Sequence, residues 1–424
     1  MKKLLYIFII SVIAVLFLNK VVFKETPEKE KQERLEDVWR YTHPITSISM
    51  DHANNSDLKI FDSILKDNRV LILGENVHSD GATMQAKGRM IQYLHENLGY
   101  NMVLYEAGQY DTWIMNEEMK NHSLKVHPDS IGGLGLFDFW WDNKETRPLI
   151  NYYQKTKTSA QPIELGGFDI QFTGNVLYDR RNNLLKEFLS KNKIDLKPFK
   201  VFSKYMNQLN HFMFEGFARR TLEGKQKEQL FNEMNQLEKA IAKLEKTPEN
   251  RMYGRYLHDM RNYLYKISKY KSGTLSSMQF RDSLMAQNLI HQIDSVYQDQ
   301  KVIVWCSNIH SFAYQESKDY RPIGAYIKSK YGKASYMIDF SSYALFNDKG
   351  KVIEKPGKLA IENIFHALKT PYFFIDLRAV PNTSILKKEF TSTINQRTDQ
   401  KKVWSRFFDG IFYIDINTSL TPIK

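Results

Sequence analysis

Short continuous apolar runs recur along the chain between residues 70 and 414, and longer amphipathic segments separate them. Runs of this length without polar alternation are typical of strands that are buried on both faces of a sheet. Their alternation with helical segments predicts an α/β fold with a mainly parallel sheet flanked by helices. The predicted strands are Val70–Leu73, Met102–Tyr105, Ile163–Phe168, Lys301–Cys306, Tyr336–Phe340, Tyr372–Leu377 and Gly410–Ile414.

The segment from Arg69 to Ala107 predicts a strand, a polar turn, a helix and a second strand. The helix is indicated by apolar residues at helical spacing, and Gly99 stands where a C-cap glycine belongs. These apolar residues are Met84, Met90, Ile91, Leu94 and Leu98. In open α/β sheets, ligands bind outside the carboxyl ends of the strands, so the polar residues after each strand become candidates for a functional site.

Residues 177–296 differ from the rest of the chain because no run among them has strand periodicity. Five apolar residues at helical spacing indicate a helix that packs along one seam. They are Leu230, Met234, Leu237, Ile241 and Leu244. We expect a large helical insertion between two strands, acting as a lid over the site, within one α/β domain that spans residues 43–424.

The N-terminal residues 1–23 have the pattern of a secretory signal. Two lysines precede the apolar run Leu4–Leu18, and no small-residue cleavage site follows it. We therefore expect an uncleaved signal anchor, a single-pass transmembrane helix in the cell membrane, with the domain outside the cytoplasm. The alternative is a cleaved signal and a secreted or periplasmic protein. Residues 24–42 are charged and poor in apolar residues, which is typical of a linker.

The formal net charge of +12 and the pI of about 9.3 do not indicate a nucleic-acid partner, because the basic residues are dispersed and do not interleave with aromatic residues. Cys306 is the only cysteine, which excludes an intrachain disulfide and a structural zinc site built on several cysteines. Because a cysteine in a strand is usually a small buried hydrophobe, we expect this role for Cys306, with a nucleophile as the alternative.

Polar residues follow four of the predicted strands. They are Glu75 with His78, then Glu106, then Asp169, then Asn308 with His310. Each alone could be a structural residue or a helix cap, but together they predict a site at one edge of the sheet. A histidine between carboxylates is held in one tautomer and can take a proton from water. No Gly-x-Ser-x-Gly motif is present, so water activation is favoured over a serine nucleophile.

Two stretches resemble the signature of the erythromycin esterase-like family: GENVHSDGATMQAK (residues 74–87) and LGYNMVLYEAGQYD (residues 98–111). Further blocks occur in the family's order, from about residue 57 to residue 414. They are GGFDIQ, RDSLMAQN, VIVWCSNIH, PIGAYI and FDGIFYI. The resemblance implies an α/β fold with a helical insertion, and a hydrolase that cleaves an ester or a lactone.

The resemblance also implies roles for single residues. His78 would be the general base, Glu75 and Glu106 its carboxylate partners, and His310 a second active-site histidine. Residues expected to bind the substrate are Lys87, Asp80, Asp169, Asn308 and Arg281. Antibiotic-inactivating members have His-Asn before the last histidine, where this chain has Ser307-Asn308, so the resemblance does not extend to macrolide hydrolysis.

The expected partner is thus a small-molecule ester or lactone, and no cofactor is expected. Two alternatives remain open because two histidines and several carboxylates are also good metal ligands. One is a metal-dependent hydrolase or peptidase of the related clan, which would need a divalent metal. The other is a non-catalytic protein that binds a ligand or haem, like the haem-binding lipoproteins of that clan.

Overall fold

A computed structural model of the protein describes residues 28–423, apart from 216–223 and 348. Within these residues nine strands form one sheet, in which β7 (Val352–Glu354) pairs with β6 beside the main path. The order along that path is β1 (His43–Pro44), β8 (Tyr372–Asp376), β11 (Gly410–Thr418), β6 (Ser335–Phe346), β2 (Val70–Leu73), β5 (Val302–Trp305), β3 (Met102–Gly108) and β4 (Glu164–Asp169). From β11 to β4 the pairs are parallel, whereas β8, β1 and β7 pair antiparallel. The predicted mainly parallel α/β fold is confirmed.

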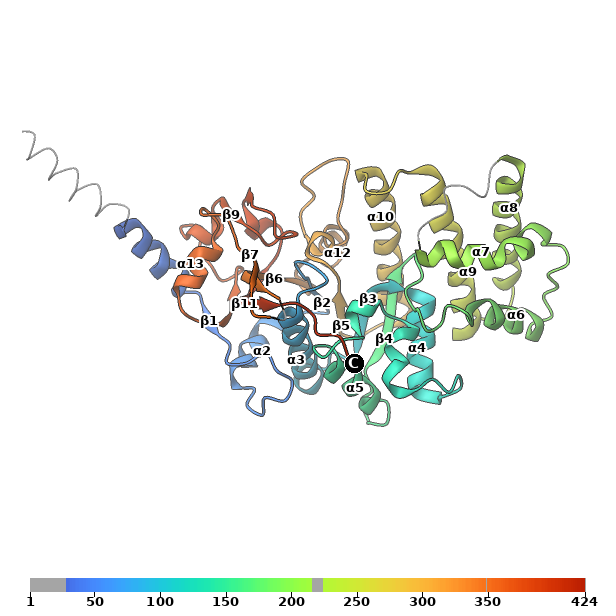
Figure 1. Ribbon diagram of the computed structural model, residues 1–424, viewed down its shortest axis with the longest axis horizontal. Coiled ribbons are helices and arrows are strands. Elements are labelled where there is room, and N and C mark those ends of the chain that lie inside the picture. Colours follow the sequence, from blue (N-terminus) through green and yellow to red (C-terminus); the bar gives the residue numbers. More distant parts are fainter. Residues whose placement is uncertain (1–27, 216–223, 348, 424) are drawn as a thin grey trace, which may run out of the picture.

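Helices cover both faces of this sheet (Figure 1). The α-helices are α2 (Ile60–Leu65), α3 (Gly81–Leu98), α4 (Gln109–Asn121), α5 (Arg147–Thr156), α6 (Arg181–Lys191), α7 (Lys200–Glu215), α8 (Gly224–Ile241), α9 (Pro248–Lys269), α10 (Leu275–His291), α11 (Asn308–Ser311), α12 (Ile323–Tyr331) and α13 (Glu362–Ala367). Short helical turns are η1 (Ser56–Lys59), η2 (Pro128–Leu134), η3 (Asp138–Trp140), η4 (Gln292–Val296), η5 (Gly332–Ala334), η6 (Ile385–Lys387) and η7 (Trp404–Arg406). A separate pair joins β9 (Phe390–Ser392) to β10 (Gln400–Lys402).

Strand β2 lies in the middle of the sheet and is buried on both faces. All four of its residues have no exposed surface. Leu71 and Leu73 belong to the core on the α3 side, whereas Val70 and Ile72 belong to the core under α10, α12 and α13. An apolar run without polar alternation is the sequence pattern of such a strand, which explains why this element was predictable.

The strand that follows the helical insertion is placed between β2 and β3. Strand β5 pairs with β2 on one side and with β3 on the other. The strands that precede His78 and carry Glu106 are therefore not neighbours, although they follow each other in the sequence. This order brings the residues after β5 to the centre of the predicted site.

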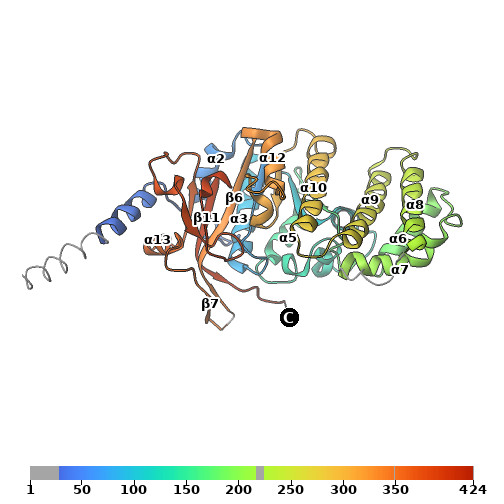
Figure 2. The ribbon, with the colours of Figure 1, turned by 90° about the horizontal axis from the view of Figure 1, so that it is seen from above.

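The helical insertion lies between β4 and β5 in the chain, and helices α6 to α9 extend to the end of the molecule opposite α13 (Figures 1 and 2). Helix α9 packs against α4, while α10 packs against β4. Among the described residues of the insertion, it is α10 that reaches the carboxyl edge of the sheet with Arg281 and Asp282. That residues 177–296 act as a lid stays a prediction.

The predicted membrane anchor is contradicted. No helix among the described residues is long and apolar enough to cross a membrane, and residues 1–23 lie outside them. In the described part of the predicted linker, residues 28–42, helix covers residues 28–39. Its end contacts the domain, because the carboxylate of Asp37 accepts hydrogen bonds from Ser384 Oγ at 2.7 Å and from the amide of Ile385 at 2.8 Å, and Val38 is fully buried.

Candidate active site

Glu75 has no exposed surface and follows directly on β2. Its Oε1 atom lies 2.6 Å from Nδ1 of His78 and accepts a hydrogen bond from the indole of Trp140 at 3.1 Å. Its Oε2 atom accepts from Lys87 Nζ at 3.0 Å and from the indole of Trp305 at 2.8 Å. Four donors therefore hold this carboxylate in one orientation.

The partners of Glu75 stabilise its charged form in the interior of the protein. Burial raises the pKa of this carboxyl, but the charge of Lys87 and the hydrogen bond from His78 outweigh burial, and the net pKa is lower than usual. Burial lowers the pKa of Lys87, and Glu75 opposes this change. The ammonium also lies 3.8 Å from the ring centroid of Trp305. Lys87 and Glu75 therefore form a buried ion pair, and both oxygens of the carboxylate accept hydrogen bonds.

His78 contacts the buried carboxylate of Glu75 and is itself partly exposed to solvent. Its ring stacks on Phe139 at 4.6 Å between centroids and meets Trp140 edge-on at 5.5 Å, while 42% of the side chain stays exposed. Burial lowers the pKa of the imidazole, but the hydrogen bond and the charge of Glu75 raise it more, so the net pKa lies above 6.5. Since Glu75 occupies Nδ1, Nε2 is the nitrogen available for chemistry.

A second cluster forms around Glu106, on strand β3. Its Oε1 atom lies 2.9 Å from Nη2 of Arg281 and 3.2 Å from Nε2 of His310, and its Oε2 atom accepts from the amide of Ser307 at 3.1 Å. Arg281 also binds Asp169 through Nε at 3.1 Å and Nη2 at 2.5 Å. Burial raises the pKa of Glu106, but the positive charges of His310 and Arg281 hold it well below its usual range.

His310 lies between two carboxylates. Its Nδ1 atom is 2.9 Å from Oδ2 of Asp282, which also accepts a hydrogen bond from the hydroxyl of Tyr320 at 2.8 Å. Burial lowers the pKa of His310, but Asp282 and Glu106 raise it to about 10. The ring is therefore an imidazolium near neutral pH. In this form His310 cannot accept a proton and does not serve as a general base.

The structure thus brings the predicted residues together in two clusters rather than one. His78 pairs with Glu75, and Glu106 pairs with His310 and Arg281. No hydrogen bond or ion pair joins His78 to Glu106 among the described residues, because β5 lies between their strands. The clusters still interact through their charges, since Glu106 raises the pKa of His78 and His310 lowers it.

Three residues expected to bind the substrate are buried and occupied. Lys87 binds Glu75, as described above. The carboxylate of Asp80 forms an ion pair with Arg397, and burial raises its pKa to about 6 despite that pair. Asn308 donates from Nδ2 to the carbonyl oxygens of Phe340 at 3.1 Å and Ile394 at 2.5 Å. A substrate could bind Lys87, Asp80 or Asn308 only if it replaced the protein groups that these side chains now contact.

Sequence reasoning missed several residues of the site. Asp282 follows Arg281 on α10, and an adjacent Arg-Asp pair in a helix near a strand edge is a signal that could have pointed to it. Tyr320 and Arg397 lie in loops and carry no comparable signal. The aromatic segment 137–141 also belongs to the site, because Phe139 and Trp140 contact His78 directly.

Cys306 has no exposed surface, and burial raises the pKa of its thiol well above the usual range, as expected of a buried hydrophobe. For a metal ion, the described residues offer no group of three or more His, Cys, Asp or Glu side chains that could hold one. The carboxylates of the site are instead paired with lysine, arginine and histidine. We therefore derive no step through a metal.

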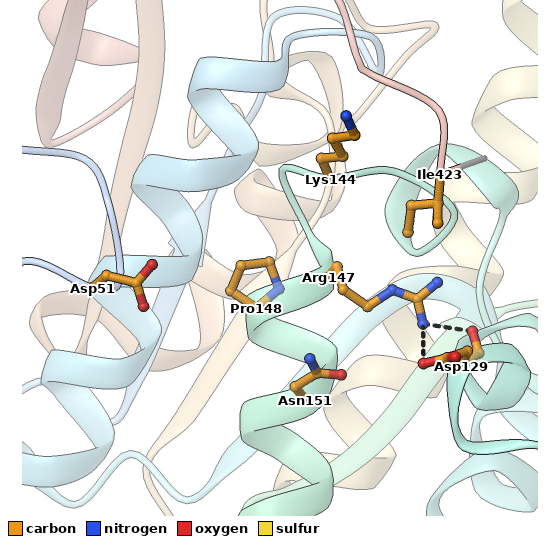
Figure 3. Close-up of a pocket in the computed structure, with 7 residues that line it drawn as sticks. All are labelled: Asp51, Asp129, Lys144, Arg147, Pro148, Asn151 and Ile423. Atoms are coloured by element: carbon orange, nitrogen blue, oxygen red, sulfur yellow. Dashed lines mark hydrogen bonds and ion pairs between the residues drawn. The ribbon is translucent and has the colours of Figure 1, made fainter.

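Two hollows in the described part of the surface contain none of the side chains of the His78–Glu75 and Glu106–His310 clusters. The larger, about 810 Å³, lies beside the start of α5, where Arg147 contacts Asp129 and Lys144 points away from both (Figure 3). The smaller, about 330 Å³, is lined by Tyr343, Glu354 and Arg397 among others. Both have acidic and basic side chains in their walls, which gives neither a clear preference for a charged ligand.

A model of the erythromycin esterase family matches residues 95–415. The chain belongs to this family. The matched segment contains Glu106, Asp169, Arg281 and His310, while Glu75 and His78 precede it. A Bacillus subtilis (strain 168) protein described as "Putative hydrolase YbfO" is 25% identical over 448 residues, which cover 95% of each chain.

Solved structures share the erythromycin esterase-like fold. A crystal structure of a Bacillus cereus protein superposes with a TM-score of 0.75 at 17% identity, over 93% of this chain and 99% of that one. A mutant of the erythromycin esterase EreC in its open conformation gives a TM-score of 0.60 at 15% identity, over 87% of this chain and 96% of that one. The expected family, fold and hydrolase class are therefore confirmed.

Proposed function

We propose that this protein hydrolyses an ester or a lactone, with His78 as the general base that activates water. The observation that carries the proposal is the pairing of a half-exposed imidazole with a fully buried carboxylate, 2.6 Å apart. A carboxylate on Nδ1 fixes the tautomer in which Nε2 is free to accept a proton. It also stabilises the imidazolium that forms when the proton is transferred.

In this proposal His78 Nε2 takes a proton from water while the water oxygen attacks the carbonyl carbon of the ester. The carbonyl π electrons move to oxygen, which gives a tetrahedral oxyanion. Collapse of this intermediate re-forms the carbonyl and breaks the bond to the leaving alkoxide, which takes a proton from His78. The products are a carboxylic acid and an alcohol, joined in one molecule if the substrate is a lactone.

The second cluster suits the opposite role. His310 has a pKa of about 10 and is therefore a proton donor at neutral pH. Arg281 carries a second positive charge beside it, and 19% of its side chain is exposed. We assign to these two cations the stabilisation of negative charge on the substrate oxygen, an effect that is strongest in sites from which water is excluded. Two histidines with differently tuned pKa values thus divide the work: His78 transfers protons, and His310 stabilises negative charge.

The test is hydrolysis of a panel of p-nitrophenyl esters and lactones by the full chain. We expect His78→Ala to lower turnover by about 10² to 10⁴. His366→Ala is the matched control, because His366 is also half-buried and lies 2.7 Å from an acid, Asp415, outside the site. Equal activity of both variants would refute the proposal. Loss of wild-type activity with a chelator, and its return with zinc or manganese, would favour the metal-dependent alternative.

A further inference from the structure

Helices α9 and α10 form an antiparallel hairpin at the side of the site. Asn288 Nδ2 lies 3.3 Å from Oδ1 of Asp259, and near the other end the ring of Phe280 contacts Tyr265 at 5.5 Å and Tyr270 at 5.3 Å. Two helical turns forward from Asp259 on α9 reach Lys266. Two turns back from residue 288 on α10 reach residue 281.

This register places Lys266 opposite Arg281, the arginine that joins Glu106 to Asp169. The electrostatics agree with the register. The pKa of Lys266 is lowered by burial and then by the charge of Arg281, while Asp169 acts in the opposite direction. Tyr263, one turn earlier on α9, interacts with the same two groups, and its ring lies 5.3 Å from Nζ of Lys266.

Lys266 differs from the other cations of the site in its partners. Lys87 is paired with Glu75, Arg281 with Asp169 and Glu106, and His310 with Asp282 and Glu106. Within the described residues no carboxylate forms an ion pair with Lys266, although its side chain is half-buried. A half-buried ammonium beside a second cation is unfavourable unless an anion joins them.

We propose that Lys266 binds an anionic group of the substrate, so that the ester hydrolysed here carries a carboxylate or a chemically similar anion away from the scissile bond. The inference rests on the proposed ester hydrolysis and adds the substrate class. It also assigns a task to α9, a helix of the insertion: the insertion selects substrates by charge. An anion at this place would supply the ion-pair partner that no described carboxylate provides.

The experiment compares two esters that differ in one charge, mono-p-nitrophenyl suberate and its neutral methyl ester, because the carboxylate of this longer diacid cannot readily attack its own ester. Wild-type protein is expected to prefer the anionic ester in kcat/KM, by a margin that shrinks as salt is added. Lys266→Met should lower kcat/KM for the anionic ester about tenfold and leave the neutral ester unchanged. Lys266→Arg should retain the preference, and Lys269→Met, a change at an exposed lysine of the same helix, should alter neither value.

Equal losses on both esters in Lys266→Met, or no preference in the wild type, would overturn the inference. Binding separates this failure from a failure of the proposed function. Calorimetric titration of His78→Ala with suberamic acid, which has no ester to cleave, should show binding that the added substitution Lys266→Met weakens about tenfold. If this binding is found while no ester is turned over by the wild type, the hydrolysis proposal is wrong and the anion site stands.

Discussion

The Nδ1 atom of His78 lies 2.6 Å from Oε1 of Glu75, a carboxylate without exposed surface that also holds two indoles and a lysine. The raised pKa of His78 depends on this contact. A general base works in its neutral form, so in wild-type protein kcat/KM should fall as the pH drops through the pKa of His78, which lies above 6.5.

Glu75→Gln removes the charge that raises this pKa. We expect the acidic limb of the kcat/KM profile to move to lower pH, because the imidazolium is less stable, and the plateau to fall by about 10² or more. A pH–rate profile of both proteins with one p-nitrophenyl ester measures the shift. An acidic limb that stays in place would show that another group controls it.

Lys87→Met should destabilise the protein rather than merely slow it. The side chains of Lys87 and Glu75 are both fully buried, so the substitution removes the ammonium that pairs with a carboxylate in the interior. Loss of one partner of such a pair costs about 3 to 5 kcal/mol. Urea unfolding measures this free energy, and Lys120→Met is the control, because its partner Glu164 is 27% exposed and such pairs contribute at most about 1 kcal/mol. Addition of Glu75→Gln to Lys87→Met should recover part of the loss, since no charge then remains unpaired.

The strands were predictable from the sequence, and their order was not. Val70–Leu73 is recognisable because four consecutive apolar residues indicate a strand that is buried on both faces of the sheet. The position of β5 between β2 and β3 depends on pairings between residues that are 200 and 232 positions apart, such as Met102 with Val302 and Val70 with Val302. A local sequence pattern carries no information about such distant pairings. Sequence reasoning therefore found His78 and Glu106 but paired them with each other.

The partners of the site histidines illustrate the same limit. Glu75 is three residues from His78, and the short spacing made this contact foreseeable. Asp282 reaches His310 from another helix, 28 residues earlier, and Arg281 reaches Glu106 across 175 residues. Such contacts follow from the packing of α10 on β4, which single-sequence periodicity does not encode.

Gly324→Ala should disturb His310 from a distance. A Cβ atom at residue 324 would lie 1.8 Å from the backbone carbonyl oxygen of Ser311, the neighbour of His310. Backbone must move to admit it, so we expect a loss of about 1 to 3 kcal/mol in unfolding free energy together with reduced turnover. Gly254→Ala in α9 is the control: its nearest neighbour would be 3.8 Å away, and alanine in a helix should leave stability equal or higher. Two variants of equal stability would contradict the close approach described here.

Asp282→Asn should move the alkaline limb of activity. If His310 acts as a cation, kcat/KM of the wild type should decline as the pH rises toward its pKa of about 10, because the imidazolium is then lost. Asp282 raises this pKa through its charge and a hydrogen bond, so the neutral amide should shift the decline toward lower pH.

The control variant is Tyr320→Phe, which keeps the carboxylate of Asp282 and removes only the hydroxyl that donates to it at 2.8 Å. This variant should shift the alkaline limb far less. Measurement of kcat/KM from pH 7 upward, with an ester whose spontaneous hydrolysis is subtracted, decides between the outcomes. An alkaline limb that is unchanged in Asp282→Asn would mean that the charge of His310 takes no part in the reaction.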